Sequence, residues 1–320
     1  MNFEGHAMKT LTLIVLLAAA VSSRAETSFP TPEAAVDALV EAVAARDQAK
    51  FDDLLGPTYR EFSSGQQSDP ALAQARMDRF EFALKQFRSL HAEGKNRYDL
   101  VVGASGWPFP VPLVRGKEGW HFDGAAGVEE LRNRIVGANE LNAIAALDAY
   151  RVAQNAYALE DYDGDGIIEY AQHVASSPGT RDGLYWTVDE DDPDAEESPL
   201  GPLIDMVNAV LGERPEGAPF LGYRFRVLYA QGANAKAGAY EYRVNGHMVG
   251  GFAMIAWPAD YGDTGIMTFI VNRDGVVYQR DLGDDTATLA EGIDAFDPDS
   301  NWTAVDDQAL ADIAEVSAPD

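Results

Sequence analysis

One short stretch of the sequence carries residue types that suit a metal ion. Three aspartates stand at alternate positions, Asp161, Asp163 and Asp165, and Gly164 and Gly166 stand between and after them. Calcium takes about six to eight oxygen ligands, and a tight loop with a carboxylate at every second position presents several of them together. Carboxylates so close repel one another unless a cation neutralises them. The spacing therefore predicts a calcium-binding loop.

The stretch follows the pattern of a twelve-residue calcium loop only in part. The predicted ligands are four side chains and one backbone carbonyl: Asp161, Asp163, Asp165 and Glu169, and the carbonyl of Ile167. The last ligand of such a loop is a bidentate glutamate, but Gln172 stands there. We therefore expect a modest affinity, about 10⁻⁴ to 10⁻³ M, unless Asp182 or Asp189 completes the shell. The alternative is a turn without metal, in which aspartate caps and glycine supplies a positive φ.

The other polar residues form no known catalytic motif. The five histidines show no zinc-protease spacing, and the chain has no cysteine to act as a nucleophile. Two carboxylates are enough to hydrolyse a glycosidic bond. With 52 acidic residues, however, the sequence singles out no pair. A periplasmic hydrolase that uses a carboxylate pair is therefore the alternative to a protein without enzymatic activity.

The N-terminal residues are typical of a secretory signal peptide. Lys9 precedes an apolar run at residues 11–21, and Ser23-Arg24-Ala25 fits a cleavage site with small residues. The run is short for a membrane span. We expect residues 1–25 to be removed, Glu26 to begin the mature chain, and the protein to be periplasmic or secreted. No second long apolar run follows, which predicts no membrane insertion after cleavage.

Composition narrows the possible partners. The 320 residues have a formal net charge of −28, which disfavours nucleic acids and anionic lipids and favours divalent cations. The absence of cysteine excludes disulfides, so an exported domain must rely on its apolar core. We expect the partner to be another envelope protein or a polymer.

Residues 29–126 have the pattern of a small α+β domain. Thr31 and Pro32 are typical of a helix start, a second helix from Asp47 is expected to end at Gly56, and Asp69-Pro70 opens a third. After Gly94 the pattern alternates, and predicts strands at residues 98–102, 109–114 and 120–122. Pro110 and Pro112 place the second of these strands at a sheet edge. This order of elements resembles an NTF2-like or cystatin-like domain.

Residues 127–300 have the pattern of a second α+β unit. A long helix is predicted over residues 127–159, bent near residues 137–139, and a strand follows the aspartate loop over residues 167–174. Five further strands are predicted at residues 223–229, 240–244, 252–257, 266–271 and 276–280. We also expect a surface loop over residues 189–198, a short helix over residues 203–211, and an acidic tail over residues 301–320 with a final helix near Leu310. The chain is thus predicted to be α+β.

Several motifs together resemble a bacterial exported family catalogued as domain of unknown function 2950. They are the segments 106–114, 161–171, 179–186, 198–202, 250–258, 261–269 and 275–279. The resemblance covers nearly the whole mature chain and implies export and this architecture, but no known reaction. The C-terminal half is also similar in plan to a pilin or pseudopilin head, some of which hold calcium in a loop. Here the N-terminal apolar segment is a cleavable signal, which argues against filament assembly.

These observations favour an exported binding or structural module over an enzyme. The aspartate loop would be stabilised by calcium. The partner would be met through exposed aromatic side chains such as Trp107, Trp186 and Trp257, and the alternative is that these tryptophans belong to the core.

Overall fold

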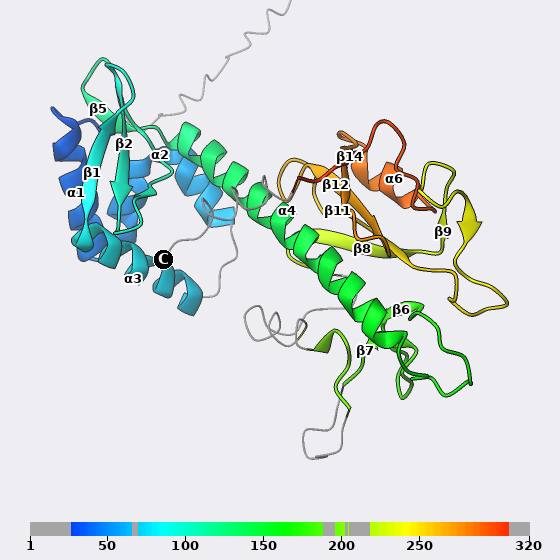
Figure 1. Ribbon diagram of the computed structural model, residues 1–320. Helices are drawn as coiled ribbons and strands as arrows, with labels where there is room; N and C mark the ends of the chain where they lie inside the picture. Colours follow the sequence, from blue (N-terminus) through cyan, green and yellow to red (C-terminus); the bar gives the residue numbers. More distant parts are fainter. Residues whose placement is uncertain (1–26, 66–69, 188–195, 202–203, 205–217, 307–320) are drawn as a thin grey trace, which may run out of the picture. The chain divides into compact units, whose positions relative to one another are not determined.

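The computed structural model describes residues 27–65, 70–187, 196–201, 204 and 218–306. Within it the chain forms two compact units (Figure 1). One unit takes in the chain up to Gly103 together with Val111–Gly124, and the other takes in Ala104–Pro110 and the chain from Ala125 onwards. The predicted signal peptide, the acidic loop at 189–195, most of the helix at 203–211 and the helix near Leu310 lie outside the described residues.

The first unit contains three helices and an antiparallel sheet. The helices are α1 (Pro32–Ala44), α2 (Gln48–Gly65) and α3 (Pro70–Gln86). The sheet has the order β1-β2-β4-β5 and is formed by β1 (Arg88–Ala92), β2 (Arg97–Val102), β4 (Leu113–Arg115) and β5 (Trp120–Phe122). The helix start at Thr31 is confirmed, because its hydroxyl accepts a hydrogen bond from the N–H of Ala34 and Pro32 follows it.

One prediction for this unit is confirmed and another is corrected. The helix expected to end at Gly56 is interrupted there, because Gly56 has non-helical backbone angles (φ 88°, ψ 174°), and a second helical segment follows directly and runs to Gly65. The strand expected over residues 109–114 begins only at Leu113, after both prolines, and β3 covers Trp107–Pro108. β4 lies between β2 and β5 and not at an edge. The strand therefore begins after the prolines, because a proline cannot donate a hydrogen bond to a neighbouring strand. The prolines do not place the strand at an edge of the sheet.

The second unit begins with one long helix. α4 (Gly124–Tyr157) is 34 residues long and continuous through residues 137–139, where a bend was predicted. The buried apolar residues of its C-terminal half recur every three or four positions: Ala143, Leu147, Tyr150, Ala153 and Tyr157. This spacing forms one apolar face on a helix, and the face belongs to the core of the unit.

A five-stranded antiparallel sheet supplies the rest of that core. It has the order β14-β13-β12-β11-β8, with β8 (Tyr223–Leu228), β11 (Ala253–Pro258), β12 (Met267–Asn272), β13 (Tyr278–Asp281) and β14 (Thr303–Ala304). All six residues of β11 are buried, since it is paired on both edges. The sequence predicted four of these strands to within two residues. It missed β14, which lies in the region predicted as a tail.

Shorter elements surround the sheet. They are β6 (His173–Ala175) and β7 (Gly183–Tyr185), which pair in parallel, β9 (Ala230–Gln231) with β10 (Tyr240–Glu241), and α6 (Thr286–Glu291). The strand predicted over residues 167–174 begins only at His173, and the segment before it forms no regular secondary structure. Likewise, only Tyr240–Glu241 of the strand predicted over residues 240–244 is formed.

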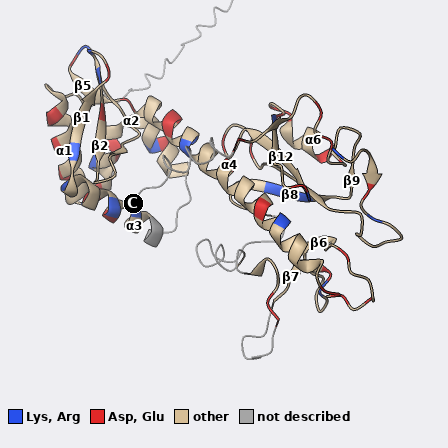
Figure 2. Cartoon of the chain, in the orientation of Figure 1, with Lys and Arg blue, Asp and Glu red and all other residues tan. Residues whose placement is uncertain are grey.

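The chain is an α+β protein, as predicted. Acidic residues are spread over the helices and loops of each unit (Figure 2). Among the residues that the structure describes, no helix is both long and apolar enough to cross a membrane.

Candidate functional site

The aspartate loop follows the C-terminal end of α4 and is held in shape by its first aspartate. Oδ1 of Asp161 accepts hydrogen bonds from the N–H groups of Gly164 (2.9 Å) and Asp165 (3.2 Å), and Oδ2 accepts one from Gly166 (2.9 Å). Gly164 and Gly166 have φ angles of 76° and 87°, which L side chains rarely adopt. The N–H of Gly166 and its neighbours lower the pKa of Asp161. Asp161 is therefore an ionised carboxylate that organises the turn.

The three aspartates converge as predicted from their spacing. One carboxylate oxygen from each of Asp161, Asp163 and Asp165 lies within 4.8 Å of the others, and all three residues are exposed. Partial loss of hydration in the loop raises the pKa of Asp163, and the charges of Asp165 and Glu169 raise it further. A carboxylate offers about four lone-pair sites, and the only loop N–H that Asp163 accepts is that of Asp165, at 3.4 Å. Asp163 thus keeps most of its capacity for a cation.

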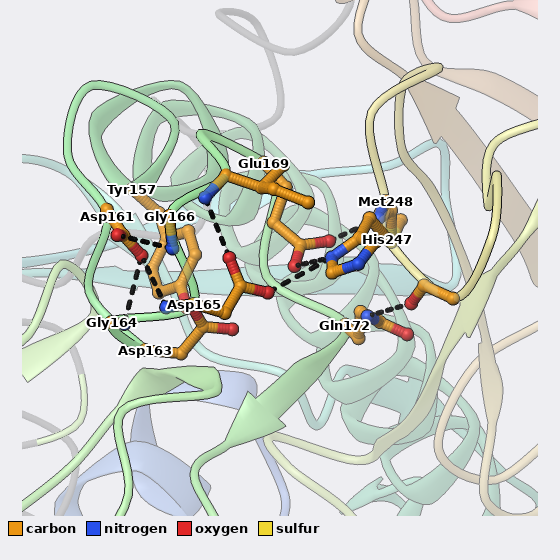
Figure 3. A network of polar contacts seen from close by, with 12 residues as sticks. Tyr157, Asp161, Asp163, Gly164, Asp165, Gly166, Glu169, Gln172, His247 and Met248 are labelled. Carbon is orange, nitrogen blue, oxygen red and sulfur yellow. Dashed lines mark hydrogen bonds and ion pairs between the residues drawn. The ribbon is translucent and has the colours of Figure 1, made fainter.

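Glu169 lies in a different group from the one predicted. It is only 6% exposed, and its oxygens face His247 and the N–H of Met248. Nδ1 of His247 lies 3.1 Å from Oε1 of Glu169 and 3.1 Å from Oδ2 of Asp165. In Figure 3 Asp165 lies between the other two aspartates and the pair formed by Glu169 and His247. Its Oδ1 accepts the N–H of Ile167 at 2.8 Å. Asp165, Glu169 and His247 form a second cluster with ligand atoms within 4.8 Å.

His247 was not predicted to belong to the site. It stands 78 residues after Glu169 and reaches it only through the fold. The hydrogen bond to Glu169 raises the pKa of His247, and the charges of Glu169, Asp165 and Asp163 add to this against the opposing effect of desolvation. The one signal in the sequence is its place directly after Asn245-Gly246, a dipeptide that is typical of a hairpin turn. That turn forms, with Val244 and His247 exchanging backbone hydrogen bonds of 2.8 and 3.1 Å.

The other residues considered for the calcium shell make contacts of their own. Ile167 joins the loop through its N–H, and its side chain is 37% exposed. Gln172, which stands in place of the last glutamate, donates from Nε2 to the carbonyl of Gly246 at 2.7 Å. Asp182 accepts from its own turn, from the N–H of Ser177 and the hydroxyls of Ser177 and Thr180. Asp189 lies outside the described residues.

The chain after the loop is anchored on two sides within the second unit. The N–H of Tyr170 donates to the carbonyl of Met248 at 3.0 Å, which joins it to the 244–248 turn. On the other side the buried amide of Gln154, on α4, pairs with the backbone of Ala171. Its Oε1 accepts the N–H at 2.9 Å and its Nε2 donates to the carbonyl at 2.8 Å. The loop therefore connects the end of α4 to the C-terminal half of the unit.

Two of the three tryptophans named for a contact surface follow the alternative, that they belong to the core. Trp186 and Trp257 are only 9% and 6% exposed and belong to the core of the second unit. Trp107 is half-buried, and the guanidinium carbon of Arg134 lies 5.3 Å from the centre of its ring. The place of Trp186 and Trp257 in the core is expected on physical grounds, because large aromatic side chains provide much of the buried area of a domain.

Comparison with known proteins identifies the family of the chain but gives no information on its activity or ligands. A family model described as "Protein of unknown function (DUF2950)" matches residues 26–305, which is most of the chain. The chain therefore belongs to this family, as its motifs predicted. No curated protein and no solved structure matches it, so the resemblance to pilin heads and NTF2-like domains gains no support from these comparisons.

Proposed function

We propose that this DUF2950 protein is an exported, non-enzymatic binding or structural module whose aspartate loop is stabilised by calcium. The observation that carries the proposal is the convergence of the Asp161, Asp163 and Asp165 carboxylates within 4.8 Å on a preformed loop. Such oxygens suit a hard cation, and a shell of about six to eight ligands leaves places for water and backbone carbonyls.

The effect of the ion would be structural. The loop leads from the end of α4 to the segment that is anchored on Met248 and Ala171. A cation that neutralises the loop would hold these parts together with no role in breaking a bond. In the envelope or outside the cell, its partner would be another envelope protein or a polymer.

Calcium should raise the melting temperature of the mature protein. With a dissociation constant of about 10⁻⁴ to 10⁻³ M, about 10 mM Ca²⁺ would stabilise the folded state by about 1.4 to 2.7 kcal/mol. Asp163→Asn keeps the side-chain shape but removes a ligand charge, and should remove most of the rise. Melting in millimolar Ca²⁺ and in chelator, followed by circular dichroism, measures this.

The matched control is Asp284→Asn, which makes the same charge change at an exposed position of the second unit. It should keep the full calcium effect. If the parent melts at the same temperature in Ca²⁺ and in chelator, the loop is only a turn and the calcium proposal fails.

Export should depend on the apolar run at residues 11–21. We expect the extracytoplasmic protein to begin at Glu26, because Ser23-Arg24-Ala25 provides the cleavage site. Leu16→Arg with Leu17→Arg places charges in the run and should leave an uncleaved protein in the cytoplasm, whereas Leu16→Ile with Leu17→Ile should be exported. N-terminal sequencing after fractionation of a bacterial host tests this, and an exported chain that still begins at Met1 or Met8 would contradict it.

A further inference from the structure

We propose that Asp165, Glu169 and His247 form a second cation site, which selects a small borderline metal ion of the zinc class and not calcium. This site goes beyond the calcium loop, because neither Glu169 nor His247 belongs to the group of three aspartates. It contains one imidazole nitrogen and two carboxylate oxygens, which is a donor set that zinc accepts. Calcium, in contrast, takes oxygen ligands.

The spacing of the donor atoms fits a small ion. Nδ1 of His247 lies 3.1 Å from Oδ2 of Asp165 and 3.1 Å from Oε1 of Glu169. Zinc binds nitrogen and oxygen at about 2.0 to 2.2 Å in a tetrahedron, so two of its ligand atoms lie about 3.3 to 3.5 Å apart. The two distances from Nδ1 to the carboxylate oxygens are therefore close to those between ligands around such an ion (Figure 3).

A proton on His247 balances only part of the charge of this cluster. Nδ1 carries at most one hydrogen, yet it faces carboxylate oxygens of two residues at the same distance. Glu169 is only 6% exposed. Buried charges are normally paired or bound to a metal. Two carboxylates around one histidine leave a negative excess even when the ring is protonated, and a divalent cation would match it.

Both carboxylates are already oriented as ligands. Asp165 accepts the N–H of Ile167 at Oδ1 and turns Oδ2 towards His247. Glu169 accepts the N–H of Met248 at Oε2 and turns Oε1 towards the same nitrogen. Such contacts behind the ligands fix their direction and strengthen a metal site.

The histidine is brought to the carboxylates by an independent set of contacts. The turn that carries it is held by Gln172, which binds the carbonyl of Gly246, and by Tyr170, which binds the carbonyl of Met248. The side chains of His247 and Asp165 are about one third exposed, at 30% and 33%. An ion can therefore enter from solvent, and water can take the fourth position.

The experiment is titration of the chelator-treated mature protein with Zn²⁺ by calorimetry, and with Co²⁺ by visible absorption. The parent should bind one zinc-class ion at this site, and Co²⁺ should give the absorption bands of a nitrogen- and oxygen-ligated ion. His247→Ala should weaken Zn²⁺ binding at least about tenfold, since it removes the one nitrogen ligand. Circular dichroism would show that the variant is folded.

Two controls separate zinc binding at this cluster from zinc binding elsewhere on the chain. His91→Ala removes an exposed histidine of the first unit and should leave Zn²⁺ affinity unchanged. Asp163→Asn removes a neighbouring charge but no ligand of this site, so it should weaken Zn²⁺ binding less than His247→Ala does, while His247→Ala should keep the calcium effect on melting. If the parent binds Zn²⁺ no more tightly than His247→Ala, or if His91→Ala weakens it equally, the site does not exist. Loss of the calcium effect alone would overturn only the calcium loop.

Discussion

Phe252→Ala should lower the free energy of unfolding by about 3 to 5 kcal/mol, the usual cost of truncating a buried phenylalanine. The side chain is completely buried, directly before β11. Its ring lies 5.6 Å from that of Tyr150 on α4 and 4.9 Å from that of Tyr170, in edge-to-face contacts. The substitution removes both contacts and leaves a cavity where the helix, the sheet and the segment after the aspartate loop meet.

Urea unfolding followed by circular dichroism measures this loss. The matched control is Val249→Ala, three residues earlier and 45% exposed, which should change stability by no more than about 0.5 kcal/mol. If Phe252→Ala and Val249→Ala unfold at the same urea concentration, Phe252 does not join these elements in the way the structure indicates.

Much of the fold could be predicted because apolar residues recur along the sequence with the period of the helix or strand whose face they bury. In the predicted helix over residues 127–159, the spacing of Leu147, Tyr150 and Tyr157 places them on one face, and all three are buried. β8 alternates between apolar and polar residues and β11 and β12 are largely apolar, so these strands were found as well. β1 was missed because it follows α3 directly and has only exposed and half-buried residues. β14 was missed because its two residues are both exposed.

The candidate site also contains residues that could be predicted from the sequence and one that could not. Asp161, Asp163 and Asp165 were found because their chemistry is local, and spacing alone brings their oxygens together. His247 was missed because its contact with Glu169 exists only after the 244–248 turn has packed against the chain behind the loop. No spacing rule connects residues so far apart.

Gln172 shows why a template can mislead. It aligns with the final glutamate of a calcium loop, but in the structure it binds the carbonyl of Gly246. The residue that departs from the calcium motif therefore holds the turn that carries the histidine of the second cluster. The calcium motif gives position 172 the role of a metal ligand, but the hydrogen bond to Gly246 shows that Gln172 supports a turn.

Gln154→Leu should also be strongly destabilising, although it removes one side chain and buries no charge. The amide is completely buried and satisfies both the N–H and the carbonyl of Ala171, at 2.9 and 2.8 Å. Ala171 is 1% exposed, so water has little access to these groups. A buried polar group left without a partner costs about 1 to 3 kcal/mol, so the two groups together should cost roughly 2 to 6 kcal/mol.

This variant tests whether α4 holds the segment behind the loop. Besides the loss in urea stability, the amide hydrogen of Ala171 should exchange much faster than in the parent. Asn155→Leu is the matched control, because the neighbouring residue is exposed and its amide binds only the carbonyl of Arg151 within the same helix. Gln154→Glu should be no better than leucine, since it turns an oxygen towards the carbonyl of Ala171 and buries a charge. If Gln154→Leu matches Asn155→Leu in stability and Ala171 keeps its protection, the connection between α4 and the loop does not depend on this amide.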